Sequence, residues 1–549
     1  MDRRKFIKKM SIVGAAAPFL INGIPLRALG STSVFNKLLN KADNNGKIMV
    51  MIQLHGGNDG LNTFVPLNMY DEYYNVRANV ALPYSGRRKL IKLDETLPDE
   101  QQLGLHPDMF NLKKLYDAGS ASIVQNIGYE NMNMSHFRSR DIYFMGGDYD
   151  DRFASGWIGR FLNHDYPGYP NNYPSTEFPD PLALELGNTN SLAFHREAGI
   201  PIGLSIANPQ AFYDLISSVG IDPPVNFPDS YYGDELAFLM NMEDKALSYA
   251  ERLKFLYETG SNSGNIIYPE RYLLSAPQNY MHNQLSEQLK ILTRLISGGS
   301  STQVYIVRIG GFDTHADQVE AYDNTMGRHS ALVYHLTSAI KAFYDDLRAQ
   351  GLDEKVVTMT FSEFGRRVYS NASYGTDHGK AAPIMLFGPG LKGGVYGNNA
   401  DLNDLDRGNL KYVYDYRQVY TSVLKDWLGA SDEALTETYF DGFIDTRLDL
   451  FGNKSKSEKN YNSDIHRLYD CYPNPVKDKL TFSYLLVEDT FVNLDIRNSK
   501  GNSIKTIKSE KELKGKYEFS VDISNFPAGI YYYSFKAGEI KSVKKLIKL

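Results

Sequence analysis

The segment from Gln303 to Gly390 constrains the fold more than any other part of the chain. Three short apolar runs within it, at 303–309, 355–361 and 383–387, are bounded by loops, and the first two are rich in β-branched residues, which predicts strands. The first two runs are joined by an amphipathic helix expected at 328–349. Uninterrupted apolar strands joined by such a helix predict an α/β fold, with a mixed or parallel sheet sandwiched between helices.

Acidic and His residues follow these strands. Asp313 and His315 come after the first strand, Glu363 follows the second, and Asp377 and His378 lie in the loop before the third. Because residues two apart in an extended segment point the same way, Asp313 and His315 can meet one ion. Several carboxylates buried together are unfavourable without a cation. We therefore predict a divalent metal site, although separate hydrated loops remain the alternative.

The mixture of imidazole and carboxylate groups suits zinc or manganese. Calcium and magnesium prefer oxygen ligands alone, and they remain alternatives for the same site.

A further apolar run at 47–54 ends in Gly56 and Gly57, which permit a tight turn close to a ligand. Asn58 and Asp59 follow this turn. In open α/β sheets ligands bind at the carboxyl ends of the strands, so Asp59 is a candidate metal ligand and Asn58 a candidate substrate-binding residue. The alternative is that Asp59 caps a turn or a helix.

Ser135 follows a predicted strand at 121–127 and precedes a helix that starts at His136. Such a serine is either a plain N-cap or a nucleophile, and the free N–H groups of the helix would favour an anion. His136, Arg138 and Arg366 are candidates for binding an anionic substrate, and solvated side chains are the alternative.

The start of the chain has a composition of its own. Residues 1–30 have a basic start and a short apolar stretch broken by Pro18 and Gly23, too short for a confident transmembrane helix. The Arg3-Arg4 pair resembles a twin-arginine signal, which predicts the twin-arginine translocase as a partner and export to the periplasm. The alternative is an amphipathic basic helix. A linker is expected at 31–46, and no transmembrane segment is expected in the mature protein.

The expected α/β domain spans 47–443, with an insertion at about 165–300 where the strand pattern weakens. A polar linker at 444–467 leads to alternating strands at 468–549, which predict a small all-β sandwich. This tail resembles the type A sorting domain of the type IX secretion system, through Tyr472-Pro-Asn-Pro and the terminal Lys545-Leu-Ile-Lys-Leu. The resemblance implies the type IX machinery as a partner and a final location at the cell surface or outside the cell. The alternative is an accessory binding module.

Charge and cysteine content exclude some functions. Residues 1–30 and the tail are basic while the net charge is −6, so the central body is acidic and poorly suited to nucleic acid. The single Cys471 excludes an intrachain disulfide and a thiolate metal cluster.

Several motifs in order, including GGNDGLNTFVPL, MSHFRSRD, GGFDTHADQ, TFSEFGRRV and GTDHGKAAPIMLFGPGLKGG, resemble the bacterial family called domain of unknown function 1501. More distantly, this family resembles the alkaline phosphatase and sulfatase superfamily, whose members place a nucleophile and two metal ions at the carboxyl edge of an α/β sheet. The resemblance implies an alkaline-phosphatase-like fold over residues 48–443.

Motif order implies roles for individual residues. Asp59 takes the place of the first metal ligand and Ser135 that of the nucleophile, while Asp313, His315 and His378 match later ligands. Glu363 and Phe364 stand where the superfamily has Asp and His, and Phe364 cannot bind a metal. The residues after Ser135 do not form the formylglycine motif, which makes sulfatase chemistry by that route a poor prediction.

The sequence thus predicts an exported, metal-dependent hydrolase of phosphate-type esters with Ser135 as nucleophile, acting on a small-molecule or polymer ester. The alternative is a non-catalytic surface protein on a degenerate fold that binds glycans or other polymers, for which Tyr-rich loops such as Tyr166–Tyr173 are candidates. A metal-bound structural scaffold is a third option.

Overall fold

The computed structural model describes residues 46–549 except 168, 170–172, 176–177, 188–189, 220–246, 453–465, 469–470, 472–473, 475, 499–501 and 539. The chain divides into Met1–Gly46 and Lys47–Leu549. Within the first unit, only the short antiparallel strands β1 (Leu20–Ile21) and β2 (Ile24–Pro25) are described. The predicted twin-arginine pair and the linker at 31–46 therefore lie outside the described residues, apart from Gly46.

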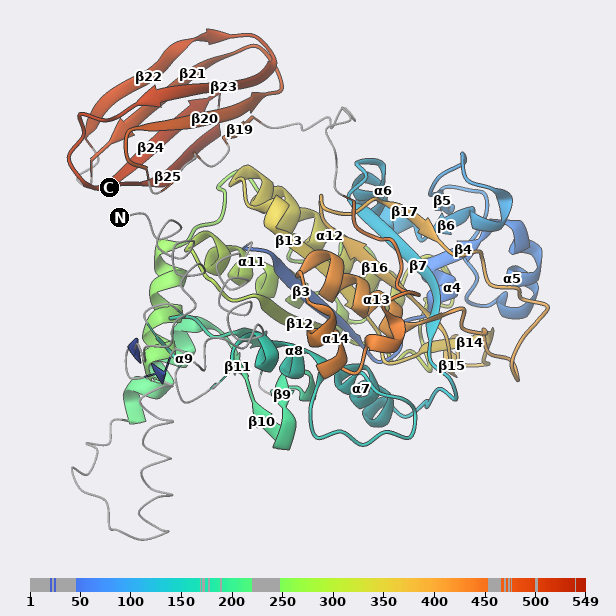
Figure 1. The fold of residues 1–549 in the computed structure, drawn as a ribbon. Helices are drawn as coiled ribbons and strands as arrows, with labels where there is room; N and C mark the ends of the chain where they lie inside the picture. Colours follow the sequence, from blue (N-terminus) through green and yellow to red (C-terminus); the bar gives the residue numbers. More distant parts are fainter. Residues whose placement is uncertain are drawn as a thin grey trace. The chain divides into compact units, whose positions relative to one another are not determined.

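A mixed nine-stranded sheet forms the centre of the α/β body (Figure 1). Its parallel part has the order β11-β8-β12-β3-β13, and β16 and β7 continue it in antiparallel fashion. β17 and β18 both pair in parallel with β7. The strands are β3 (Ile48–His55), β7 (Ala121–Gly128), β8 (Ala183–Leu186), β11 (Gly203–Ile206), β12 (Val304–Gly310), β13 (Val356–Phe361), β16 (Ala382–Phe387), β17 (Gly394–Tyr396) and β18 (Tyr414–Asp415).

Helices cover both faces of this sheet because its central strands are apolar on both sides (Figure 1). On β3, Met49 and Met51 belong to one hydrophobic core, and Val50 and Ile52 to the core on the opposite face. The first core is closed by α7 (His136–Met145), α8 (Trp157–Asp165), α13 (Tyr416–Ser422) and α14 (Asp432–Glu437), and the second by α6 (Phe110–Asp117), α11 (Gln284–Ser297) and α12 (Arg328–Ala349).

Segment 165–300 differs from the predicted insertion. β8 and β11 lie within it, and they extend the main sheet beyond β12 through parallel pairing. Each of these strands has only four residues, too few to stand out from the surrounding loops. The segment also contains β9 (His195–Arg196), β10 (Ile200–Pro201) and α9 (Pro209–Val219). Part of the region is therefore sheet scaffold.

Smaller elements pack beside the main sheet. The strands β4 (Phe64–Pro66), β6 (Leu103–Leu105) and β5 (Ile91–Lys92) form an antiparallel sheet near the short helices α4 (Gly60–Thr63) and α5 (Tyr70–Arg77). A hairpin of β14 (Gly365–Ser370) and β15 (Thr376–Gly379) follows β13. This hairpin contributes directly to the candidate site.

The C-terminal part of the chain is an all-β sandwich. One sheet has the order β19-β20-β23 and the other β22-β21-β24-β25, with antiparallel pairing throughout. The strands are β19 (Arg467–Leu468), β20 (Lys479–Leu486), β21 (Thr490–Arg497), β22 (Ser503–Glu512), β23 (Gly515–Asp522), β24 (Gly529–Ala537) and β25 (Ile540–Lys548). Alternate residues such as Leu494 and Ile496 fill its core.

These two architectures confirm the predicted fold class, an α/β body with a mixed sheet between helices and a small all-β sandwich. No helix in the described part of the chain is long and apolar enough to cross a membrane.

Candidate metal centre

Two glycines bring the loops at the carboxyl edge of the sheet close together. Gly56 and Gly57 follow β3 with φ values of +123° and +88°, a region that favours glycine. A Cβ atom on Gly56 would lie 2.2 Å from the backbone nitrogen of Asp313, and one on Gly57 would lie 2.4 Å from the ring of Phe364. The loops after β3, β12 and β13 therefore meet only because both positions lack side chains.

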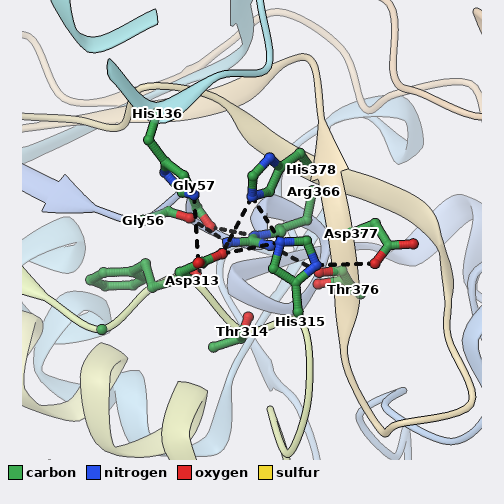
Figure 2. A network of polar contacts seen from close by, with 12 residues as sticks. Gly56, Gly57, His136, Asp313, Thr314, His315, Arg366, Thr376, Asp377 and His378 are labelled. Atoms are coloured by element: carbon green, nitrogen blue, oxygen red, sulfur yellow. Dashed lines mark hydrogen bonds and ion pairs between the residues drawn. The ribbon is translucent and has the colours of Figure 1, made fainter. Parts of the chain in front are cut away.

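Four residues meet at this edge and form what we call the histidine cluster: His136, Asp313, His315 and His378 (Figure 2). Asp313 lies at its centre. Its Oδ1 atom is 3.3 Å from Nε2 of His315 and 3.3 Å from Nε2 of His378, and its Oδ2 atom is 3.5 Å from Nε2 of His136. All three imidazoles thus direct the same ring nitrogen towards one carboxylate.

The opposite ring nitrogen of two of these imidazoles is held by an acceptor. Nδ1 of His315 is 3.1 Å from Oδ1 of Asp377, and Nδ1 of His378 is 2.9 Å from the carbonyl oxygen of Met134. An ionised carboxylate and a carbonyl can only accept, so each Nδ1 carries the proton in these hydrogen bonds. Each Nε2 is therefore left with a lone pair when the imidazole is neutral.

His136 is held in the same way by a buried carboxylate. Its Nδ1 lies 3.0 Å from Oε1 of Glu363, which also accepts a hydrogen bond of 2.7 Å from the backbone N–H of Gly56. Ser139 of α7 donates to the carbonyl oxygen of Glu363, which ties the helix to this loop. Glu363 is fully buried, and its Oε2 atom has no hydrogen-bond partner among the described residues.

This donor set fits a metal cation. Nε2 of His315 and Nε2 of His378 are only 2.8 Å apart, so two lone pairs would face each other beside a carboxylate without a positive charge between them. One ligand atom each from His136, Asp313 and His378 lie within 4.8 Å of one another. Imidazoles whose second nitrogen is held by a carboxylate or carbonyl are the usual surroundings of a bound metal.

Neighbouring charges set the protonation states. Burial alone would raise the pKa of Asp313, but the hydrogen bond and charge of Arg366 outweigh it and hold this pKa below 3.8. Burial, followed by the charge of Arg366, lowers the pKa of His378 below 6.5. The hydrogen bond to Glu363 raises the pKa of His136 above 6.5. At neutral pH Asp313 is thus ionised and His378 neutral, as metal ligands must be.

An aromatic ring closes one side of the cluster. Phe364 is fully buried, and its ring centroid lies 4.4 Å from that of His378 and 4.8 Å from that of His136. The residue that motif order places where the superfamily has a His therefore packs as an apolar wall against two candidate ligands.

Ser135 and Arg138 lie at the start of α7, on either side of His136. Ser135 is exposed at the N-cap, and its side chain makes no capping hydrogen bond. Its hydroxyl is therefore not committed to the helix end, unlike that of an ordinary N-cap serine. Arg138 donates to the carbonyl oxygens of Tyr149 and Asp151, so it braces a loop and is not directed at the cluster.

Two predicted residues after β3 have partners elsewhere. Asp59 caps α4 and receives hydrogen bonds of 2.8 and 2.9 Å from Nη1 of Arg77 and one of 2.7 Å from Gln318. Among the described residues it has no hydrogen bond or ion pair with the histidine cluster. The Oδ1 atom of Asn58 accepts from the hydroxyl of Thr63. The alternative interpretation, in which Asp59 is a cap, matches these contacts.

The structure therefore brings together Asp313, His315 and His378 as inward-facing groups, with Glu363 and Asp377 behind them as supports. His136, which the sequence suggested for substrate binding, faces inward with the other imidazoles. The sequence feature that could have indicated this role is the position of His136 in the first turn of a helix that follows a strand. That turn lies at the carboxyl edge of the sheet. Arg366 contacts Asp313 through a hydrogen bond of 2.7 Å.

Two known families match parts of the chain. Residues 275–442 match the family described as "Protein of unknown function (DUF1501)", and residues 470–549 match the "Secretion system C-terminal sorting domain". No curated protein sequence matches the chain.

Solved structures with similarity to the chain include three from distant proteins. A protein in the alkaline phosphatase superfamily from Vibrio parahaemolyticus is 10% identical with a TM-score of 0.30, covering 81% of this chain and 76% of its own. An alkaline phosphatase from the Antarctic bacterium TAB5 is 13% identical with a TM-score of 0.25, covering 64% and 95%. Ps i-CgsB in complex with k-i-k-neocarrahexaose is 12% identical with a TM-score of 0.32, covering 80% and 84%.

The sorting domain indicates export through type IX secretion to the cell surface or the extracellular space, which confirms the predicted location and the type IX machinery as a partner. Residues 275–442 of the α/β body are thus similar to the DUF1501 family, and residues 470–549 are similar to a secretion-system sorting domain.

Proposed function

We propose that the histidine cluster binds a divalent transition metal and that the protein hydrolyses phosphate-type esters outside the cell. The observation that carries the proposal is the convergence of three Nε2 atoms on the Asp313 carboxylate, with every Nδ1 held by an acceptor. Zinc or manganese fits this mixture of nitrogen and oxygen donors better than calcium or magnesium.

A bound divalent ion would act as a Lewis acid towards a phosphoryl oxygen and would lower the pKa of bound water. The protein's own groups hold the ligands in place. Glu363 and Asp377 keep His136 and His315 in the tautomer with a free Nε2, and Arg366 orients Asp313. Phe364 excludes water from one side of the imidazoles, which strengthens electrostatic interactions there.

Ser135 is the candidate nucleophile because its hydroxyl is exposed, has no capping role and lies one residue from His136. In the proposed reaction its Oγ loses a proton and forms a bond to phosphorus, while the ester bond to the leaving alcohol breaks and the alcohol takes up a proton. Water then cleaves the phosphoserine, which releases phosphate and restores the hydroxyl. The N-terminal N–H groups of α7 favour the anionic phosphoryl group at this position.

Metal analysis combined with an esterase screen tests this proposal. We expect purified protein to retain zinc or manganese and to cleave a chromogenic phosphate monoester or diester. Ser135→Ala should lose the activity and keep the metal, whereas His378→Ala should lose both. Wild-type protein that binds no divalent ion and cleaves neither ester class would refute the function.

A second candidate is a non-catalytic surface protein that binds a polymer. The observation in its favour is Phe137, whose side chain is 73% exposed one residue from His136. Tyr166, Tyr169 and Tyr173, which the sequence suggested for stacking on sugars, are instead buried in the core, so they cannot supply this surface. Loss of polysaccharide pull-down in Phe137→Ala, without turnover by the wild type, would favour this candidate.

We also propose that the chain reaches the periplasm through the twin-arginine translocase before type IX export, on the strength of the Arg3-Arg4 pair. Arg3→Lys with Arg4→Lys should hold the protein in the cytoplasm. Unchanged export of this variant would refute the route.

A further inference from the structure

The guanidinium of Arg366 is surrounded by oxygen atoms next to the histidine cluster. Its side chain is fully buried. Nε donates to the carbonyl oxygen of Gly57 at 2.8 Å and Nη1 to that of Thr376 at 2.9 Å. Nη2 contacts the carbonyl oxygens of Gly56 and Phe312 and Oδ1 of Asp313. Carbonyl and carboxylate oxygens converging on one point are the surroundings that a hard cation requires.

Arg366 and its partners come from four separate segments of the chain. Gly56 and Gly57 follow β3, Phe312 and Asp313 follow β12, Thr376 begins β15, and Arg366 itself lies on β14. The guanidinium thus links the same loops that surround the histidine cluster (Figure 2). Because it is always charged at physiological pH, it supplies a permanent positive charge at the carboxyl edge.

A second arginine, Arg77, neutralises Asp59, the carboxylate that motif order suggested as the first metal ligand. Arg77 and Asp59 have 0% and 1% side-chain exposure, and Nη1 of Arg77 reaches both oxygens of Asp59. Gln318 donates to Oδ2 as well. Asp59 therefore has no uncompensated charge to offer to an ion.

The remaining groups at this edge offer too few donor atoms for a second ion site. Phe364 offers no donor atom, and Oε1 of Glu363 is shared by the N–H of Gly56 and Nδ1 of His136. Oε2 of Glu363 has no hydrogen-bond partner among the described residues, and Nδ1 of His55 lies 3.5 Å from Oε1 of the same carboxylate. One carboxylate oxygen and one imidazole are fewer ligands than a tightly bound divalent ion needs.

We propose that the site holds a single divalent ion, and that the guanidinium of Arg366 takes the place of a second metal cation. The proposal rests on the proposed function, and it departs from the two ions that the resemblance to the phosphatase superfamily implied. The carboxylate of Asp313 would contact both the bound ion and the guanidinium, since Oδ1 contacts Arg366 and both oxygens face the imidazoles. The arginine also fixes the orientation of Asp313 whether or not the ion is bound.

Stoichiometry and electron paramagnetic resonance test this inference without reference to activity. Full-length protein stripped with a chelator is titrated with Zn²⁺ by calorimetry and loaded separately with Mn²⁺. We expect one tight equivalent of Zn²⁺ and the six-line spectrum of an isolated Mn²⁺. Two tight equivalents, or the exchange-coupled spectrum of a Mn²⁺ pair at about 3.5–4 Å, would overturn the inference and leave the proposed function intact. Absence of any tight ion would refute both.

Phe364→His provides a second, sharper measurement. If a missing imidazole were the sole obstacle to a second ion, this variant would bind two equivalents. With Arg366 and Arg77 in place, we expect it to bind one. Two equivalents in the variant would show that Arg366 does not fill the second position, and would overturn the inference even if the wild type binds one.

Discussion

The variant Asp59→Ala distinguishes two possible roles of Asp59, that of a structural carboxylate and that of a metal ligand. The motif resemblance predicts that Asp59 binds metal, whereas the structure buries it against Arg77 at 2.8 and 2.9 Å. Removing one partner of a buried ion pair leaves the other charge without compensation, which costs about 3–5 kcal/mol. Asp59→Ala should therefore lower the free energy of unfolding by that amount and leave the bound metal at its wild-type level.

The size of the thermal shift follows from the entropy of unfolding. A cooperative unit of roughly 400 residues unfolds with an entropy near 0.8 kcal/mol/K, so about 3–5 kcal/mol corresponds to a Tm decrease of roughly 4–6 °C. Unfolding is followed by circular dichroism in a chelator, because a bound ligand would add its own stabilisation. Metal content of the untreated protein is measured in parallel.

A matched pair of variants isolates the ion pair itself. Arg77→Met alone should also destabilise the protein, because Asp59 is then buried without its partner. The double variant Asp59→Ala/Arg77→Met should be more stable than the two single effects added together, since replacing both charges by apolar groups is much less costly. An Asp59→Ala protein with wild-type stability in chelator and reduced metal content would refute the structural role.

The remaining predictions concern a support residue, pH and targeting. Glu363→Gln should weaken Zn²⁺ affinity by about 10–100-fold in a competition assay, because it removes the charge behind His136; an unchanged affinity would contradict that role. Burial lowers the pKa of His329 from 6.5 to about 4, so the native state keeps it neutral while the unfolded chain protonates. The contribution of His329 to the free energy of unfolding is complete above pH 6.5. It falls as the pH drops towards 4, by at most roughly 3 kcal/mol. His329→Gln should flatten this part of the pH-stability curve measured by denaturant unfolding. Deletion of residues 470–549 should leave the protein in the periplasm by fractionation, and unchanged surface delivery would contradict the sorting role.

Much of the main sheet could be predicted because its strands are long and apolar on both faces. The predicted strand at 303–309 and helix at 328–349 correspond to β12 at Val304–Gly310 and α12 at Arg328–Ala349. β8 and β11 were not predicted, because each has only four residues and is recognisable only by its pairing with a neighbour. Hydrophobic periodicity identifies long helices and strands reliably and short ones poorly.

The location of the candidate site could be predicted from the sequence, but which residues face the site could be predicted only in part. Strand order brings Asp313 and His378 to one edge, so their nearness follows from pattern and motif order. Whether a carboxylate there binds metal or supports a ligand depends on its partner. Glu363 holds His136, and Asp59 is held by Arg77, a residue 18 positions later on α5.

The α/β class, the C-terminal sandwich with its secretion signal, and the segment that supplies the acidic and His residues could all be predicted from the order of the amino acids. Those properties follow from periodicity, composition and motifs that are local in the chain. Which side chains face one another depends on how the loops meet in the folded protein. Arg366 is the clearest case, because four carbonyls and a carboxylate from separate loops converge on its guanidinium. Charge compensation depends on distance in space, and distance in sequence does not determine it.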